Sequence, residues 1–183
     1  MIVVLTGKSC SGKDSVRNVL VDKYGYENVI SYTTRPMRRG EIQGKEYWFV
    51  SKEEMEEMRR AGKIIDYREY KVKCGEVWGY GHTIFKTNKN KNYVAIVDLE
   101  GAKKFRKIYK NQCKIVYIDS NKIYRTKRAS KRGDDLEEWL RRLKADDIDF
   151  SDIKINSLVD YKIINEDRDI TDLAYEIDKY IRG

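Results

Sequence analysis

The stretch GKSCSGKDS, from Gly7 to Ser15, has the composition of a loop that binds phosphate groups. It matches the pattern G-x-x-x-x-G-K, in which glycines let backbone N–H groups face an anion and the lysine reaches the outer phosphates. An apolar run from Ile2 to Leu5 precedes the loop and a helical pattern follows it, which is the context that such a loop requires. These residues predict a nucleotide phosphate site formed by Gly7, Lys8, Ser9, Cys10, Ser11, Gly12, Lys13, Asp14 and Ser15.

Asp14 stands where the pattern has Ser or Thr, whose hydroxyl contacts magnesium. We expect Asp14 to stabilise the start of the helix, because an acid in the first turn interacts favourably with the helix dipole, by ~0.3–1 kcal/mol. Magnesium keeps several of its waters in phosphate sites, so the missing hydroxyl does not exclude it, and Ser15 is one position away. Cys10 is expected to be a small tolerated residue, with a lowered thiol pKa in the positive loop as the alternative.

Composition predicts one globular domain with small insertions, since the 183 residues are 37% charged and include one proline. The formal net charge of +8 favours an anionic partner such as a nucleotide or nucleic acid, with a solvated lysine-rich surface as the alternative. Three cysteines and one histidine fit reduced thiols better than disulfides or a zinc site. No apolar run approaches the ~18 residues of a membrane span, and MIVVL is too short for a signal peptide, so we expect a cytoplasmic protein.

The order of apolar runs and helical patterns predicts an α/β fold with a parallel central sheet. The predicted strands are 2–5, 93–97, 114–118 and 161–164, and a final helix carries Ile170, Leu173, Ala174, Ile177 and Ile181 on one face. Between Thr33 and Thr83 this alternation stops, and one helical stretch lies among aromatic-rich segments. An inserted α+β subdomain is therefore predicted there.

The segment SYTTRPMRRGEIQGKEYWFV, from Ser31 to Val50, resembles the acceptor-binding segment of guanylate kinases. The phosphate loop before it, and the stretches VDLEG, RASKRG and IINED after it, extend this resemblance over nearly the whole chain. It implies a three-layer P-loop fold in residues 1–183, with a core of 1–32 and 84–183. It also implies a nucleoside monophosphate-binding subdomain at 33–83 and a helical lid at about 122–143.

The resemblance implies that Arg35, Arg38 and Tyr47 hold the phosphate of the acceptor nucleotide, assisted by Tyr80. Two guanidinium groups and a phenol suit a dianionic phosphate, because arginine binds such oxygens in a bidentate manner. Packing of Tyr47 in an aromatic core is the alternative for that residue, and the neighbouring Arg38 and Arg39 leave the register between them open.

For the guanine base, the resemblance points to Ser31, Asp66 and Asp98, since a carboxylate can accept the N1–H and amino hydrogens of guanine. The chain departs from the family here, because Asp66 stands where Glu is typical and His82 where Ser or Thr is typical, with Thr83 next to it. The segment KVKCGEVW also looks longer than usual. A surface charge is the alternative for Asp66, and an ordinary polar residue is the alternative for His82.

The resemblance places Arg128, Arg132, Arg141 and Arg142 in the lid that closes over the phosphates. We rank Arg128, Arg132 and Arg142 above Arg141, because one of the two adjacent arginines should face water. Together with Lys13 and Arg35, those three form the predicted catalytic set. Asn165 resembles the residue near the donor adenine, with a turn at the strand end as the alternative.

The sequence thus predicts a kinase that transfers the γ-phosphate of ATP to GMP or dGMP. Mg²⁺ would be bound through ATP phosphates and water, with no protein metal site. We expect a monomer or homodimer with no nucleic-acid or membrane partner. The alternatives are a kinase for a different nucleoside monophosphate and a non-catalytic guanylate-kinase-like module that binds a protein. Lys13 with Arg35 and Arg38 favours the enzyme, because a binding module has no need of Lys13.

Overall fold

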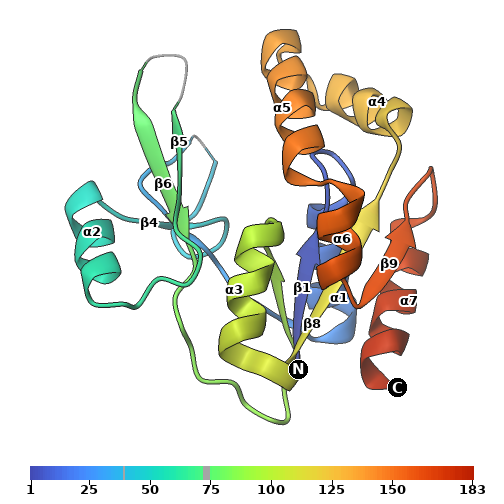
Figure 1. The fold of residues 1–183 in the computed structure, drawn as a ribbon, viewed down its shortest axis with the longest axis horizontal. Coiled ribbons are helices and arrows are strands. Elements are labelled where there is room, and N and C mark those ends of the chain that lie inside the picture. Colours follow the sequence, from blue (N-terminus) through green and yellow to red (C-terminus); the bar gives the residue numbers. More distant parts are fainter. Residues whose placement is uncertain (39, 72–74) are drawn as a thin grey trace. The chain divides into compact units, whose positions relative to one another are not determined.

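The computed structural model of the chain describes residues 1–38, 40–71 and 75–183. The chain forms two compact units, which we call the core unit and the insert unit. The core unit contains Met1–Asn28 and Lys89–Gly183, and the insert unit contains Val29–Asn88. Figure 1 shows in cyan and green how the insert unit interrupts the core unit along the chain.

The core unit is built on a five-stranded parallel sheet with the strand order β2-β7-β1-β8-β9. The four apolar runs that the sequence marks as strands are four of these, so the predicted α/β class with a parallel sheet is confirmed. The strands are β1 (Ile2–Thr6), β2 (Glu27–Asn28), β7 (Tyr93–Ile96), β8 (Cys113–Asp119) and β9 (Tyr161–Ile164).

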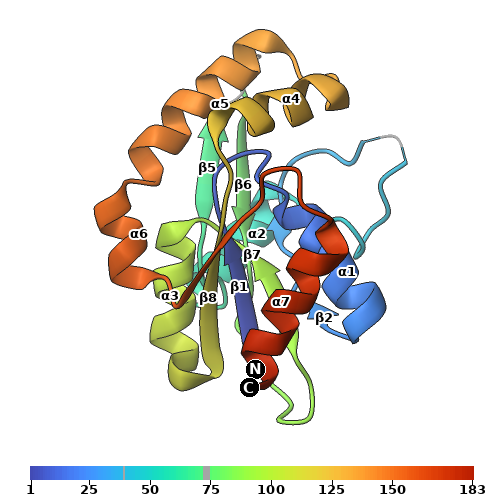
Figure 2. The same cartoon turned by 90° about the vertical axis from the view of Figure 1, so that its right-hand side faces the viewer.

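Helices cover both faces of this sheet and give the core unit three layers, as Figure 2 shows. α1 and α7 lie against one face, α3 and α6 lie against the other, and α4 and α5 lie beyond the carboxyl ends of the strands. The helices are α1 (Lys13–Tyr24), α3 (Leu99–Tyr109), η1 (Lys110–Gln112), α4 (Lys122–Arg132), α5 (Leu136–Asp149), α6 (Asp152–Leu158) and α7 (Ile170–Arg182).

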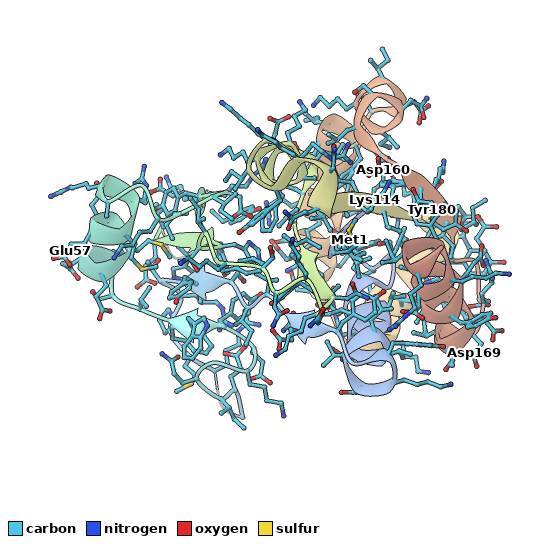
Figure 3. All side chains as sticks on the ribbon, turned by 90° about the horizontal axis from the view of Figure 1, so that it is seen from below. Met1, Glu57, Lys114, Asp160, Asp169 and Tyr180 are labelled. Carbon is cyan, nitrogen blue, oxygen red and sulfur yellow. The ribbon has the colours of Figure 1, made fainter. Side chains whose placement is uncertain are left out.

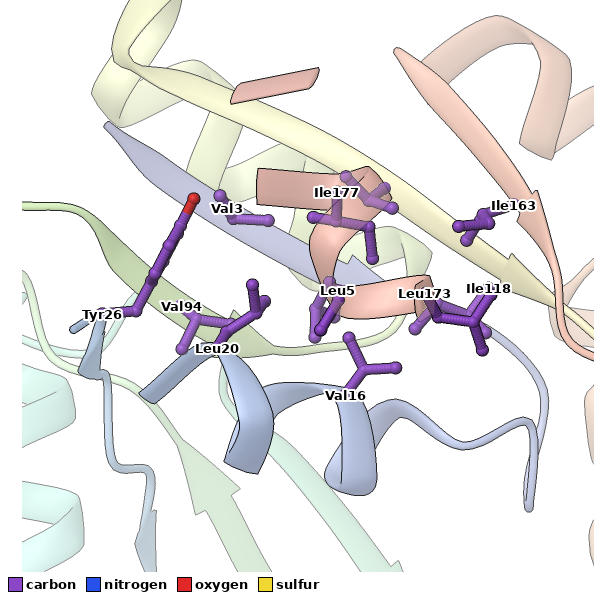
Figure 4. Close-up of a cluster of buried hydrophobic side chains, with 12 residues drawn as sticks. Val3, Leu5, Val16, Leu20, Tyr26, Val94, Ile118, Ile163, Leu173 and Ile177 are labelled. Carbon is purple, nitrogen blue, oxygen red and sulfur yellow. The ribbon is translucent and has the colours of Figure 1, made fainter. Parts of the chain in front are cut away.

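The main hydrophobic core lies between the sheet and the pair α1 and α7 (Figure 4). Val3 and Leu5 point to this face because alternate residues of a strand share a side, and both are fully buried. They pack with Val16 of α1 and with Leu173 and Ile177 of α7. Burying each such side chain contributes about 1.5–3 kcal/mol, so this contact fixes α1, and with it the loop that enters α1.

Side chains from β8, from α7 and from the residue before β9 lie near the amino-terminal end of the sheet (Figure 3). Figure 3 shows Lys114, Asp160 and Tyr180 gathered there, and the Lys114 ammonium lies 6.0 Å from the centre of the Tyr180 ring. The carboxylate of Asp160 accepts the backbone N–H of Ile115 at 2.7 Å. These contacts belong to packing at this end of the strands.

The insert unit has its own four-stranded sheet, with the order β4-β3-β6-β5 and both parallel and antiparallel pairs. Its strands are β3 (Tyr32–Thr33), β4 (Trp48–Phe49), β5 (Arg68–Lys71) and β6 (Val77–Gly81). Its helix α2 (Lys52–Arg60) begins with a capping box, in which Ser51 and Glu54 bond each other's backbone N–H groups. The helical stretch predicted among aromatic-rich segments is therefore confirmed.

Candidate active site

The loop between β1 and α1 has the backbone that a phosphate-binding loop needs. Gly7 and Gly12 have φ values of 153° and 102°, a region that residues with a Cβ rarely adopt. A Cβ at Gly7 would lie 2.4 Å from the carbonyl oxygen of Ile118, and one at Gly12 would lie 2.4 Å from Nδ2 of Asn165. Both glycines are thus required by backbone conformation and by close approach of neighbouring atoms.

Lys13 folds back over this loop. Its ammonium donates to the carbonyl oxygens of Gly7 at 2.7 Å and of Lys8 at 2.8 Å, and it lies 3.4 Å from the hydroxyl of Ser11. Desolvation lowers the pKa of Lys13, while the carboxylates of Asp14 and Asp146 oppose that shift. A cation is therefore held at the mouth of the loop by neutral oxygens that a phosphate oxygen can replace.

The first turn of α1 presents the remaining donors of the loop. The helix begins after Gly12, which has no side-chain cap, and the N–H groups of a first turn have no partner within their own helix. Asp14 is exposed and lies 3.6 Å from Arg17, one turn further on, so it occupies the helix-start position expected for it. The positive end of α1 is therefore open to an anion.

Asn165 and Arg128 bind the outside of the loop. Asn165 follows β9, is fully buried, and donates from Nδ2 to the carbonyl oxygen of Ser11 at 2.8 Å. Arg128 of α4 donates from Nη1 to the carbonyl of Cys10 at 3.2 Å and from Nη2 to Oδ1 of Asn165 at 3.1 Å. The structure thus brings both predicted residues to the loop. Asn165 also occupies the position directly after strand β9, and its side chain contacts the backbone of the loop.

Cys10 requires a correction. Burial raises the pKa of its thiol, and the opposing charge of Arg132 is the smaller effect, so the alternative of a lowered pKa is wrong. The side chain packs against Ala129, Trp139 and Leu143. Cys10 therefore behaves as a small apolar residue, although its φ of 59° is uncommon for a residue other than glycine.

The predicted lid region spans α4 and the first half of α5, and α5 continues to Asp149. Arg132, Arg141 and Arg142 are each paired with an acid of α5 or of the turn that joins α4 to α5. Arg132 binds Asp134 through two nitrogens. Arg142 donates to Oε1 of Glu138 at 2.9 Å, and Arg141 donates to Oε2 of the same residue at 2.7 Å. Because both arginines bind Glu138, these contacts do not show which of the two faces the phosphates. The ranking of Arg142 above Arg141 as a catalytic residue stays a prediction.

In the insert unit, Arg35 is the centre of the candidate phosphate site for the acceptor. Its side chain is only 4% exposed and donates to Oε1 of Glu41 at 2.6 Å. The guanidinium carbon lies 5.3 Å from the centre of the Tyr47 ring, and Tyr80 packs edge-on against Tyr47 with ring centres 5.8 Å apart. Three of the four residues predicted to hold the acceptor phosphate are therefore together.

Arg38 is the fourth residue predicted to hold the acceptor phosphate, and its side chain is exposed. Its backbone N–H donates to Oε2 of Glu41 at 2.7 Å, so Glu41 joins the two arginine positions. The hydrogen bond from Arg35 lowers the pKa of Glu41. Sequence reasoning missed Glu41, although an acid three residues after Arg38 in an otherwise basic segment was a usable signal.

The candidate base-reading residues are divided between the units. Asp66 and His82 form a buried pair in the insert unit, with Nδ1 of His82 2.9 Å from Oδ2 of Asp66. Ser31 precedes β3, and its carbonyl accepts the N–H of Trp48. Asp98 lies in the core unit, where it caps α3 by accepting the N–H of Gly101 at 2.8 Å.

Some residues discussed from the sequence lie outside the described ranges. They are Arg39 and the stretch 72–74, which includes Cys74 and three of the eight residues of the segment KVKCGEVW. Each helix within residues 1–38, 40–71 and 75–183 lacks the length and apolar character that a membrane crossing requires.

Comparisons with known proteins agree with this geometry. Residues 1–182 match the family model for guanylate kinase. The chain is 31% identical over 169 residues to the guanylate kinase of Symbiobacterium thermophilum, covering 91% of this chain and 78% of that protein. It is also 31% identical over 189 residues to the guanylate kinase of Anaplasma phagocytophilum, covering 100% of this chain and 86% of that protein.

The solved structures give the same result. The crystal structure of guanylate kinase from Anaplasma phagocytophilum has a TM-score of 0.68 at 26% identity, covering 100% of this chain and 84% of that one. A crystal structure of an uncharacterized protein from Eubacterium ventriosum, at 14% identity and a TM-score of 0.54, shares the fold. Since the guanylate kinase family model matches residues 1–182 of the 183 residues, this chain belongs to the guanylate kinase family.

Proposed function

We propose that this chain transfers the γ-phosphoryl group of ATP to GMP or dGMP, giving ADP and GDP or dGDP. The observation that carries the proposal is Lys13, whose ammonium is held over the phosphate loop by the carbonyls of Gly7 and Lys8. A lysine in this position serves phosphoryl transfer, because it neutralises charge on the phosphates during the reaction.

On the donor side, the loop and the open end of α1 bind the phosphates of ATP. The N–H groups and the positive end of the helix receive the inner phosphates, and Lys13 contacts the outer ones. Arg128, Arg132 and Arg142 stabilise the migrating phosphoryl group. This role is supported for Arg128 by its contact with Cys10 of the loop, and for Arg132 and Arg142 by their place on the two helices beyond the strand ends.

On the acceptor side, Arg35, Arg38, Tyr47 and Tyr80 hold the phosphate of the nucleoside monophosphate. Arg35 is held in place by Glu41 and by the Tyr47 ring, which orients the guanidinium before the acceptor binds. Ser31, Asp66, His82 and Asp98 are the proposed contacts to the base. Holding the attacking phosphate oxygen in line with the γ-phosphorus is the main contribution of these residues.

The described residues near the phosphate loop supply hard oxygen donors for magnesium. Among the described residues, no group of three or more His, Cys, Asp or Glu side chains could hold a metal ion. The first turn of α1 offers the carboxylate of Asp14 and the hydroxyl of Ser15, and both residues are exposed. This donor set fits an ion held mainly by ATP phosphates and water. When bound, magnesium would neutralise part of the charge on the phosphates of ATP.

We place the reaction in the cytoplasm. Cys10 and Cys113 are free thiols, as expected in a reducing compartment. Closure of the subdomain 33–83 and of the lid over both nucleotides would exclude water, which would otherwise hydrolyse ATP.

The test is a steady-state assay of the purified chain with MgATP and a panel of ribo- and deoxynucleoside monophosphates, scored by ADP release. We expect GMP or dGMP to give the highest kcat/KM, and AMP to be at least ~10-fold poorer, the ratio that corresponds to 1.4 kcal/mol. Adenine places a ring acceptor where guanine has N1–H, so a buried carboxylate would face an acceptor.

The outcomes separate the parts of the proposal. A preference for AMP, CMP or UMP would overturn the guanine assignment and leave kinase activity in place. No ADP release with any acceptor, in a protein that still binds MgATP, would overturn the catalytic assignment and favour a binding module.

A further inference from the structure

The carboxylate of Asp146, on the inner face of α5, binds the phosphate loop directly. Its Oδ2 accepts the backbone N–H of Ser9 at 2.9 Å, and its Oδ1 accepts the Ser9 hydroxyl at 3.1 Å. Asp146 is buried. Neither the phosphate-loop pattern nor the family resemblance assigned a role to this residue, which lies 137 positions from Ser9.

Arg125 of α4 completes the contact. Its Nη1 donates to Oδ2 of Asp146 at 2.7 Å and lies 3.4 Å from the carbonyl of Ser9. The side chains of Arg125 and Asp146 are 3% and 9% exposed. A buried ion pair is weak evidence for a gain in stability, because desolvation of the charges offsets their attraction. A role in fixing one geometry of the loop explains the pair better.

Three consecutive residues of the loop are each held from outside. Ser9 is held by α5, the carbonyl of Cys10 accepts from Arg128 of α4, and the carbonyl of Ser11 accepts from Asn165 after β9. Figures 1 and 2 show α4 and α5 beyond the end of the sheet where this loop lies. Each contact fixes the direction of a peptide plane, and a phosphate nest depends on the directions of its N–H groups.

We propose that Asp146 is a positioning residue for ATP. Through Ser9 it holds the apex of the phosphate loop in the conformation that receives the phosphates, and Arg125 compensates its charge. It does not contact the nucleotide itself. This role rests on the proposed function, in which the loop binds ATP. It also makes the loop conformation depend on the packing of α5, a helix whose first half is the proposed lid.

A second ion pair between α5 and the phosphate loop provides a matched control for a substitution of Asp146. Asp147, the next residue, pairs with Lys8 of the loop at 2.9 Å, but its side chain is 71% exposed. Exposed ion pairs contribute little, because water screens the charges and both side chains are mobile. The same substitution at two adjacent residues therefore compares a buried contact to the loop with an exposed one.

The test compares Asp146→Asn with Asp147→Asn by calorimetric titration with MgADP and by steady-state kinetics. Asparagine at 146 loses the charge that compensates Arg125, and only one of its two side-chain positions can accept, so an amide donor faces one of the groups that the carboxylate now bonds. We expect at least ~10-fold weaker MgADP binding and a similarly raised KM for ATP, with the KM for GMP changed less than ~twofold. Asp147→Asn should stay within ~twofold of the parent throughout.

The double variant Arg125→Met with Asp146→Leu separates positioning from folding. Replacing a buried ion pair by apolar side chains should restore the thermal midpoint that either single change lowers. MgADP binding should remain weak, because Ser9 has no carboxylate in this variant. Recovery of binding together with the midpoint, or parent-like binding by Asp146→Asn, would overturn the positioning role. A parent that binds no MgADP would overturn the proposed function as well.

Discussion

The carboxylate of Asp66 accepts the backbone N–H of His82 at 2.6 Å and lies 2.9 Å from the ring nitrogen Nδ1 of the same residue. Because a carboxylate can only accept, Nδ1 carries the hydrogen between them. The side chains are 9% and 6% exposed, so this pair is part of the interior of the insert unit. The two departures from the family pattern are thus not independent, since each residue fixes the other.

Asp66→Asn is expected to lower kcat/KM for GMP by ~10-fold. The ratio of kcat/KM for GMP to kcat/KM for AMP should fall as well. The amide can still accept the N–H of His82, but it loses the charge and one acceptor, so a buried donor loses its best partner. The measurement is ADP release with GMP and with AMP. Glu69→Gln is the matched control, because Glu69 is an exposed acid of the same unit. Unchanged selectivity in Asp66→Asn would remove Asp66 from the base-reading set.

Lys13→Ala is expected to lower kcat by orders of magnitude while leaving the thermal midpoint near that of the parent. The charge that builds up on the phosphates in the transition state loses its partner, whereas the core packing of α1 does not involve the Lys13 side chain. Steady-state kinetics and thermal unfolding measure the two effects. Lys23→Ala, at the exposed last turn of the same helix, serves as the control. Nearly unchanged turnover would mean that Lys13 is not catalytic.

The fold could be predicted from the sequence because the central strands of the core unit, β1 and β8, are short apolar runs with buried residues on both faces. Strand β1 is fully buried, and the periodicity of α7 matches the face that packs on the sheet. Helix α6 was not predicted, because seven residues are too few to show a helical period. The two-residue strands β2 and β3 exist only through pairing with distant partners, which local pattern cannot reveal.

The sequence predicted the candidate site residues whose types and spacing suit phosphate binding, and it missed those that act through contacts with other protein groups. Arg35 and Lys13 stand in motifs whose spacing has a chemical meaning. Glu41, Asp146 and Arg125 act through contacts with other side chains, and the last two approach the loop only after the chain has folded. No local spacing marks such long-range partners.

Arg38→Ala is expected to raise the KM for the acceptor by ~10-fold or more, with a smaller effect on the KM for ATP. A charged hydrogen bond to phosphate contributes about 1.5–3 kcal/mol, and Arg38 has no role in holding the insert unit, since its side chain is exposed. Kinetics with each substrate varied in turn measure this. Arg60→Ala, an arginine with a 77% exposed side chain in the same unit, is the control. Equal increases in the KM for ATP and in the KM for the acceptor would show that the assignment of Arg38 to the acceptor site is wrong.

Asp14→Thr is expected to be active and to need no more magnesium than the parent. Threonine restores the hydroxyl of the usual pattern, while the loss of an acid in the first turn costs the helix only ~0.3–1 kcal/mol. The measurement is the magnesium concentration at half-maximal turnover, with thermal unfolding as the control for the helix. A large loss of turnover would give Asp14 a catalytic role.

Glu138 should make the lid helices sensitive to acid. The hydrogen bond from Arg141, followed by that from Arg142, lowers the pKa of Glu138 from 4.5 to about 2. Between pH 4.5 and about 2, the Glu138 side chain binds more protons in the unfolded chain than in the folded one. The stability that Glu138 contributes is therefore present above pH 4.5 and is lost as the pH falls toward 2. Glu138→Gln lacks this titration. It should be less stable than the parent at pH 6, and the gap should close as the pH falls.

Urea unfolding of the parent and Glu138→Gln at pH 6, 4 and 3 measures that gap, and the common titration of other acids cancels in the difference. The side chain is 29% exposed, so solvent screening keeps the gap small, and the double variant Arg141→Met with Arg142→Met provides the control. Glu138→Gln introduced into that background should have no pH-dependent effect, because the partners are gone. A gap that persists there, or one that widens as the pH falls, would show that these arginines do not set the pKa of Glu138.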